Sequence, residues 1–212
     1  MTISLTDTGR RFNRDWIFRH LNFQFFQGNA YAITGPNGSG KSTLLQVIAG
    51  ALSPSEGKIH YHTEEGRLPS PAPVNPERIF LQLSIAAPYL DLIEEMTLQE
   101  FLEFHRQFKP FLTAVTIPGI IALVGLEKAA HKQIRYFSSG MKQRVKLAQA
   151  IFSDTPLLLL DEPCTNLDAE GVALYQQLIS RYGGNRLIIV SSNDTAEYPF
   201  CREQINISHF KS

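Results

Sequence analysis

Short apolar runs and longer stretches with helical spacing alternate along the chain. Three runs are continuous and apolar, as in parallel strands that helices cover on both faces: residues 30–34, 157–160 and 187–190. Between residues 88 and 154 the apolar positions instead recur at helical intervals. We therefore expect an α/β core that is interrupted by a mainly helical insertion.

Three helices are expected within the insertion. Thr97 and Glu100 stand three residues apart, as the N-cap and N3 residues of a capping box do, and Pro110 ends the apolar spacing that follows them. Residues 117–124 and 139–152 carry the same spacing. A proline-rich stretch, residues 68–76, is expected to form a surface connection, because proline lacks a backbone donor.

Composition narrows the class of protein. The 212 residues are 43% hydrophobic and 19% charged, enough for a sizeable core in one domain. Lysine plus arginine and aspartate plus glutamate both number 20, with no basic stripe, so nucleic acid is not expected as a partner. The sequence contains no apolar run near 18 residues, no signal-peptide pattern and no disulfide framework, which makes a cytoplasmic location the default expectation.

Residues 35–43 read Gly-Pro-Asn-Gly-Ser-Gly-Lys-Ser-Thr and fit the phosphate-binding P-loop, G-x-x-x-x-G-K-[ST]. Glycines let backbone N–H groups converge on a triphosphate, and the helix that follows favours the anion. We expect nucleotide contacts from Gly35, Pro36, Asn37, Gly38, Ser39, Gly40, Lys41, Ser42 and Thr43. Lys41 would reach the β and γ phosphates, and the Ser42 hydroxyl would bind Mg²⁺.

A second motif ends the apolar run at residues 157–160 with two carboxylates. Asp161 fits the second protein contact of Mg²⁺, and Glu162 could orient and deprotonate the attacking water. A strand followed by an ordinary acidic turn would look the same. The P-loop upstream favours the metal site.

Two further segments carry a family resemblance. Residues 137–144, Phe-Ser-Ser-Gly-Met-Lys-Gln-Arg, resemble the signature of the ATP-binding cassette (ABC) ATPases, and residues 165–168, Thr-Asn-Leu-Asp, resemble their D-loop. The chain resembles this family over nearly its whole length. The resemblance implies an α/β fold with a RecA-like P-loop NTPase core, an antiparallel β-subdomain and an inserted α-helical subdomain. It implies a single domain, 1–212, with the core in 1–86 and 154–212 and the helical subdomain in 87–153.

The resemblance also implies further site residues. Gln82 stands where the family has its Q-loop glutamine, a ligand of Mg²⁺ that helps to orient water. Phe12 stands near the place of the aromatic residue that stacks on adenine, with Trp16 as a rival. Nucleotide contacts are further implied for Ser138, Ser139, Gly140 and Asp168, which would complete the ATP site of a second cassette in a homodimer or heterodimer.

The sequence departs from the family pattern at three positions. Ser139 replaces a glycine and Met141 a glutamine, while Asn193 replaces the histidine that contacts the γ-phosphate. Asparagine can donate a hydrogen bond, but it cannot carry a positive charge or transfer a proton. We expect slowed but not abolished hydrolysis, with a catalytic set of Glu162, Gln82, Asn193 and Lys41.

The function implied by the resemblance is that of the ATP-hydrolysing subunit of an ABC transporter, with ATP and Mg²⁺ as cofactors. Separate transmembrane permease subunits would hold it peripherally on the inner face of the plasma membrane. The short length and the Met-Lys-Gln-Arg segment resemble cassettes that serve ABC-2-type or haem-exporter-like permeases. Two alternatives stay open: a soluble ABC ATPase without transport, and an ATP-binding module with impaired hydrolysis.

Overall fold

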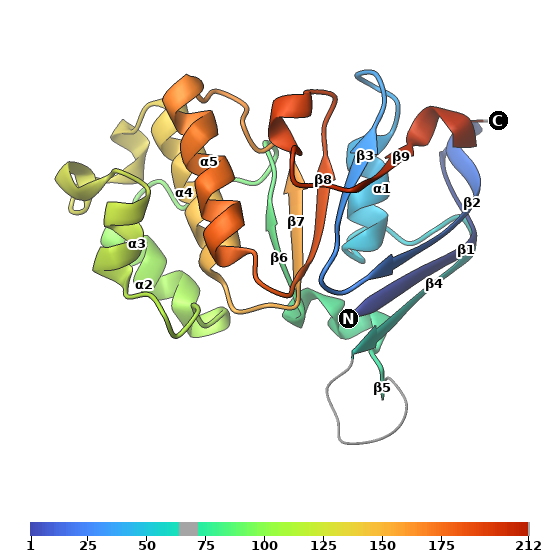
Figure 1. The fold of residues 1–212 in the computed structure, drawn as a ribbon, viewed down its shortest axis with the longest axis horizontal. Helices are drawn as coiled ribbons and strands as arrows, with labels where there is room; N and C mark the ends of the chain where they lie inside the picture. Colours follow the sequence, from blue (N-terminus) through green and yellow to red (C-terminus); the bar gives the residue numbers. More distant parts are fainter. Residues whose placement is uncertain (64–71, 212) are drawn as a thin grey trace.

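The computed structural model describes residues 1–63 and 72–211, which form two sheets with a group of helices beside the second (Figure 1). The first sheet is antiparallel, in the order β2-β1-β4-β5. Its strands are β1 (Thr2–Phe12), β2 (Asp15–Phe26), β4 (Glu56–Thr63) and the two-residue β5 (Ala72–Pro73). Of the proline-rich connection expected at 68–76, residues 68–71 lie outside the described residues. Its remainder forms β5 at the sheet edge and the start of the short 3₁₀ helix η1 (Pro76–Leu81).

The second sheet is parallel and has the order β6-β7-β8-β3-β9. Its strands are β3 (Ala30–Thr34), β6 (Leu83–Ala86), β7 (Leu157–Asp161), β8 (Leu187–Ser191) and β9 (Glu203–Asn206). The three strands expected from the apolar runs are confirmed, and all residues of β7 and β8 are buried. The two edge strands were not expected, because they are short and less uniformly apolar.

Five α-helices accompany the sheets in the described part of the chain: α1 (Lys41–Ile48), α2 (Leu98–Phe108), α3 (Ile117–Leu123), α4 (Ser139–Phe152) and α5 (Ala169–Tyr182). The three helices expected in the insertion are confirmed. Thr97 caps α2, and the reciprocal bonds between Thr97 and Glu100 form the predicted capping box. None of the helices in the described ranges is long and apolar enough to cross a bilayer.

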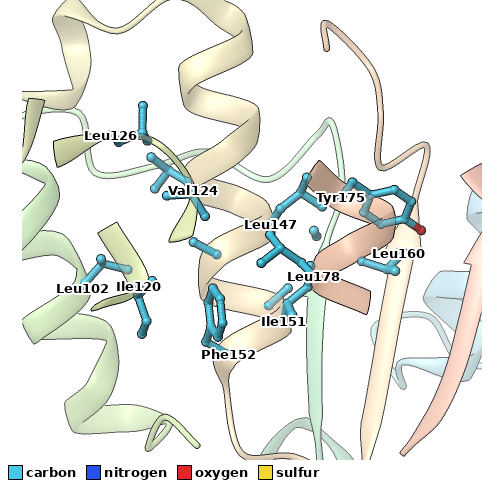
Figure 2. Close-up of a cluster of buried hydrophobic side chains, with 14 of the residues drawn as sticks. Leu102, Ile120, Val124, Leu126, Leu147, Ile151, Phe152, Leu160, Tyr175 and Leu178 are labelled. Carbon is cyan, nitrogen blue, oxygen red and sulfur yellow. The ribbon is translucent and has the colours of Figure 1, made fainter. Parts of the chain in front are cut away.

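Apolar packing joins the insertion to the parallel sheet through α4. Leu102 of α2 and Ile120 of α3 belong to the same buried cluster as Phe152 of α4 (Figure 2). On the other side of α4 the cluster continues to Leu160 of β7 and Leu178 of α5. Burying a large apolar side chain contributes about 1.5–3 kcal/mol, so this continuous cluster holds α4 firmly between the sheet and the outer helices.

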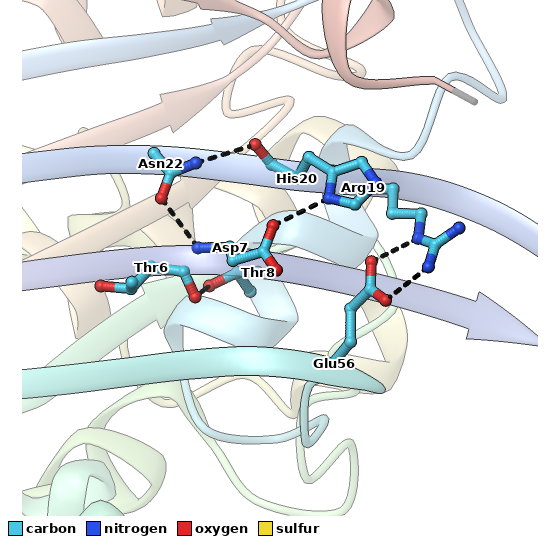
Figure 3. A network of polar contacts seen from close by, with 7 residues as sticks. All are labelled: Thr6, Asp7, Thr8, Arg19, His20, Asn22 and Glu56. Carbon is cyan, nitrogen blue, oxygen red and sulfur yellow. Dashed lines mark hydrogen bonds and ion pairs between the residues drawn. The ribbon is translucent and has the colours of Figure 1, made fainter.

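Two left-handed residues break the regular pairing of β1 with β2. Asp7 and His20 have φ angles of 47° and 57°, and their side chains meet at 2.8 Å (Figure 3). Asn22 accepts a hydrogen bond from the Asp7 amide, while the Arg19 guanidinium pairs with Glu56 of the neighbouring β4. The register shifts between Leu5 and Thr8, as at a β-bulge. The same hairpin reaches the P-loop, where the Ile17 side chain lies beside Gly40.

Candidate nucleotide-binding site

The P-loop links β3 to α1, and its glycines are required by the backbone. Gly35 and Gly40 have φ angles of 143° and 105°, in the region that disfavours side chains. A Cβ at Gly35 would lie 2.8 Å from Ser39 Oγ, and one at Gly40 would lie 2.3 Å from a methyl carbon of Ile17. The loop therefore curls tightly beneath the start of β2, with Lys41 opening α1.

The interior of the loop carries positive charge. The Lys41 ammonium is buried and donates to the carbonyl oxygens of Gly35, at 2.9 Å, and of Pro36, at 3.3 Å. The Ser39 hydroxyl is buried and has no hydrogen-bond partner among the described residues. A cation held at the N-terminus of a helix, with backbone N–H groups around it, suits the phosphates of a nucleotide.

Asp161 lies at the carboxyl end of β7, beside this loop. The side chain is 1% exposed, and its Oδ1 has no hydrogen-bond partner within the described ranges. Burial is the main cause that raises the pKa of Asp161 above its usual value of 3.8, although the nearby Ser191 and Ser42 hydroxyls and Lys41 lower it. An unpaired buried carboxylate oxygen beside a hydroxyl fits a hard cation such as Mg²⁺, whose remaining ligands are usually water and phosphate oxygens.

Glu162 follows directly and turns the chain out of the sheet. Its φ is 43°, and its amide donates to Ser191 O at 2.9 Å. The side chain is half-buried, and after burial its negative charge also raises the pKa of Asp161. Because its backbone is left-handed, Glu162 does not continue the alternating side-chain directions of β7. It lies at the carboxyl edge of the sheet, where the P-loop also lies.

Asn193 also reaches the P-loop. It follows β8, and its Nδ2 donates to Oδ1 of Asn37 at 3.1 Å. Ser192 donates its amide to Ile33 O, the residue before the end of β3. The structure thus brings Asn193 to the same edge as Lys41 and Asp161.

The expected placement of Gln82 at this site is wrong. Gln82 precedes β6, and its carbonyl accepts from the amide of Leu157, the first residue of β7. Because β6 and β7 are parallel, Gln82 lies at their amino end, four residues or about 13 Å along β7 from Asp161. Nucleotides bind at the carboxyl ends of such strands. Gln82 is therefore too far from Asp161 to belong to the catalytic or metal-binding residues.

Tyr89, in the segment after β6, lies near Asp161 with a side chain that is 45% exposed, and sequence reasoning did not identify it. Partial burial and, to a smaller extent, the charge of Asp161 raise the pKa of Tyr89, and the nearby Gln46 side chain of α1 lowers it. The register of β6 with β7 pairs Ala86 with Leu160, which places the following residues level with Asp161. The sequence signal that could have identified Tyr89 is the short apolar run 83–86. As a strand parallel to 157–160, it would lead the following residues to the same edge of the sheet as Asp161.

Phe12, at the end of β1, is 44% exposed, and the Arg10 guanidinium lies 4.8 Å from its ring centroid. Trp16, its rival in the prediction, is more buried and lies within 4.4 Å of the Arg19 guanidinium and 5.5 Å of that of Arg11. Phe12 is the more accessible of the two rings. A role for either in base stacking stays a prediction.

The signature segment opens a separate cleft. Ser138 caps α4 by accepting a hydrogen bond from the Met141 amide at 3.3 Å. A cleft of about 670 Å³ is lined by residues 125–129, 138–141, 144 and 166–168, so Ser138, Ser139, Gly140 and Asp168 come together there. Oδ1 of Asp168 caps α5 and lies 3.9 Å from Arg144. All of these lining residues lie outside the P-loop, and the two halves of the expected ATP site are therefore apart within one chain.

Comparison with known proteins agrees with this geometry. Residues 18–165 match the family model described as ABC transporter. The chain is 31% identical over 195 residues to the cytochrome c biogenesis ATP-binding export protein CcmA of Agrobacterium fabrum, which covers 91% of this chain and 88% of the relative. It is 32% identical over 171 residues to the Nod factor export ATP-binding protein I of Bradyrhizobium diazoefficiens, covering 79% of this chain and 54% of that protein.

A solved structure shows the same fold. A bacterial ABC transporter cassette, determined as a dimer, superposes with a TM-score of 0.77 at 20% identity, over 97% of this chain and 95% of the cassette. The family match spans the P-loop, the insertion and the turn of Asp161 and Glu162. The chain therefore belongs to the ABC transporter family, as one of its ATP-binding ATPase cassettes.

Proposed function

We propose that this cassette hydrolyses Mg–ATP to drive export through separate permease subunits, to which it binds on the cytoplasmic face of the membrane. Export is supported by the names of two relatives, a cytochrome c biogenesis ATP-binding export protein and a Nod factor export ATP-binding protein. The exported substrate would be selected by the permease.

Each residue at the site has a task in this proposal. The P-loop amides and Lys41 bind the phosphates, and Asp161 with Ser42 would hold Mg²⁺, which neutralises charge on the transferred phosphoryl group. Glu162 orients the attacking water and accepts its proton. Asn193 supplies a hydrogen-bond donor near the γ-phosphate. The observation that carries the proposal is Oδ1 of buried Asp161, which has no hydrogen-bond partner in the described part of the chain and lies beside the loop that holds Lys41.

A second cassette completes the site. Ser138, Ser139 and Gly140 lie at the start of α4, where free N–H groups favour an anion, in a cleft apart from the P-loop of the same chain. Two copies arranged about a two-fold axis would each place this segment over the nucleotide of the other.

ATP turnover by the purified protein, measured across protein concentrations, tests the enzymatic part. We expect the rate to rise faster than linearly with protein, to require Mg²⁺, and to be lost in Glu162→Gln while that variant still dimerises with ATP. A rate proportional to protein, or one retained in Glu162→Gln, would contradict the mechanism.

Recovery of the protein from cell membranes tests the partner. We expect the tagged chain to co-purify with an integral membrane protein after detergent extraction, and its turnover to change in that complex. Exclusive recovery from the soluble fraction would favour an ABC ATPase without transport.

A further inference from the structure

Two buried side chains hold the peptide segment that follows Glu162. Gln143 of α4 donates from Nε2 to the carbonyl oxygen of Pro163 at 2.6 Å. Glu197, in the short helix η4 (Thr195–Glu197), accepts at Oε1 from the amide of Cys164 at 2.8 Å. Gln143 is 4% exposed and Glu197 5% exposed. Consecutive residues of one turn are thus bonded to two different elements.

The turn needs such support, because Glu162 has a left-handed backbone. A φ of 43° is unfavourable for a residue with a Cβ by about 1–2 kcal/mol. Such a conformation persists only where the surroundings hold it in place. Two backbone bonds contribute, from the Glu162 amide to Ser191 O and from the Thr165 amide to Glu162 O. The side chains of Gln143 and Glu197 hold the two residues between these bonds.

Both supports are themselves anchored. Gln143 lies one turn into α4, the helix that Ser138 caps, so its bond joins the signature segment to the turn of Glu162. Glu197 stands four residues after Asn193, and its carbonyl accepts from the Tyr175 hydroxyl of α5 at 2.8 Å. Oε2 of Glu197 has no hydrogen-bond partner among the described residues, so Oε1 alone joins this carboxylate to the Cys164 amide.

We propose that Gln143 and Glu197 are positioning residues for Glu162, which clamp the Pro163–Cys164 segment from α4 and η4 and thereby fix the backbone from which the Glu162 carboxylate reaches water. The effect on catalysis rests on the proposed function of Glu162. The clamp itself is a property of the folded chain.

Hydrogen exchange tests the clamp without activity. Glu197→Gln keeps an acceptor oxygen of the same shape, whereas Glu197→Met removes it at similar volume. We expect the Cys164 amide to exchange about tenfold faster in Glu197→Met, the loss of roughly one hydrogen bond, and within twofold of wild type in Glu197→Gln. Equal exchange in all three proteins overturns the proposal.

Steady-state kinetics test its consequence. In Glu197→Met and Gln143→Met we expect kcat to fall about tenfold with an unchanged KM for ATP, and Glu197→Gln to restore most of kcat. If Gln143→Met does not fold, as judged by circular dichroism, Gln143→Asn is measured in its place. That variant keeps the amide but shortens the side chain by one methylene. A parallel loss of ATP binding in the Met variants, or an equal loss in Glu197→Gln, contradicts positioning. A wild-type protein without turnover would contradict the proposed function, while the exchange result would still decide the clamp.

Discussion

Asn193 donates a hydrogen bond from Nδ2 to Oδ1 of Asn37 across 3.1 Å, which joins the loop after β8 to the P-loop. The contact uses the one donor group that an asparagine side chain offers. It places an uncharged amide at the edge of the site that also holds Lys41 and Asp161.

Asn193→His is expected to raise kcat for ATP about fivefold, because a histidine can carry positive charge near the phosphates; a fivefold change corresponds to about 1 kcal/mol. Turnover at saturating Mg–ATP measures this. Asn193→Ala serves as the matched control and should lower kcat. Unchanged turnover in Asn193→His would mean that Asn193 already performs the task.

Gln82 and Tyr89 should differ sharply in their effect on hydrolysis. Gln82→Ala changes a residue at the amino end of β6 and should leave kcat and the Mg²⁺ dependence within twofold of wild type. Tyr89→Phe removes a hydroxyl near Gln46 and Asp161 and should lower kcat about fivefold. Titration of turnover with Mg²⁺ compares the two variants. A loss in Gln82→Ala together with wild-type behaviour of Tyr89→Phe would restore the original expectation.

Asp161→Asn should abolish ATP turnover and stabilise the nucleotide-free protein against unfolding. The wild-type carboxylate is buried, and its Oδ1 has no partner among residues 1–63 and 72–211, which costs folding free energy until a cation binds. Without nucleotide at neutral pH, we expect the variant to be about 1 kcal/mol more stable in urea denaturation. It should have no turnover, and Mg–ATP should raise its Tm less than that of wild type. A variant less stable than wild type without nucleotide would contradict this account.

His105 should make the helical insertion sensitive to acid. Burial, and secondarily the charge of Lys109, lower the pKa of His105 from 6.5 to about 4, and its Nε2 lies 2.9 Å from Ser153 Oγ. The unfolded chain takes up this proton first, so stability is present above the unfolded pKa of 6.5 and is lost as the pH falls toward about 4.

Urea denaturation across that pH range measures the effect. His105→Gln keeps a group that can bond Ser153 but does not titrate, so its free energy of unfolding should fall less steeply on acidification than that of wild type. Parallel pH profiles for the two proteins would exclude His105 as the source.

Local patterns were sufficient for much of the fold and for the residues around the phosphates. The central residues of β3, β7 and β8 are buried on both faces, so each strand is apolar up to its last residue and could be recognised alone. The capping box of Thr97 lies within four consecutive residues. The P-loop glycines are required by the backbone conformation of the loop itself, so the motif predicts that conformation without reference to distant residues.

The antiparallel sheet was harder to place strand by strand, because its alternation is interrupted. Asp7 and His20 adopt left-handed conformations that shift the register of β1 against β2, and a pattern of period two is lost across each. The sheet was expected only through the family resemblance.

The sequence by itself determined the phosphate-binding loop, the carboxylates after β7, and the alternation of strands and helices, since each depends on neighbouring residues. Only the tertiary structure decided which end of the sheet a residue occupies. Gln82 and Tyr89 lie close in sequence, yet the direction of β6 beside β7 sends them to opposite edges. It also decided that Gln143 and Glu197 meet the turn after Glu162, because such long-range hydrogen bonds arise from packing and leave no local pattern.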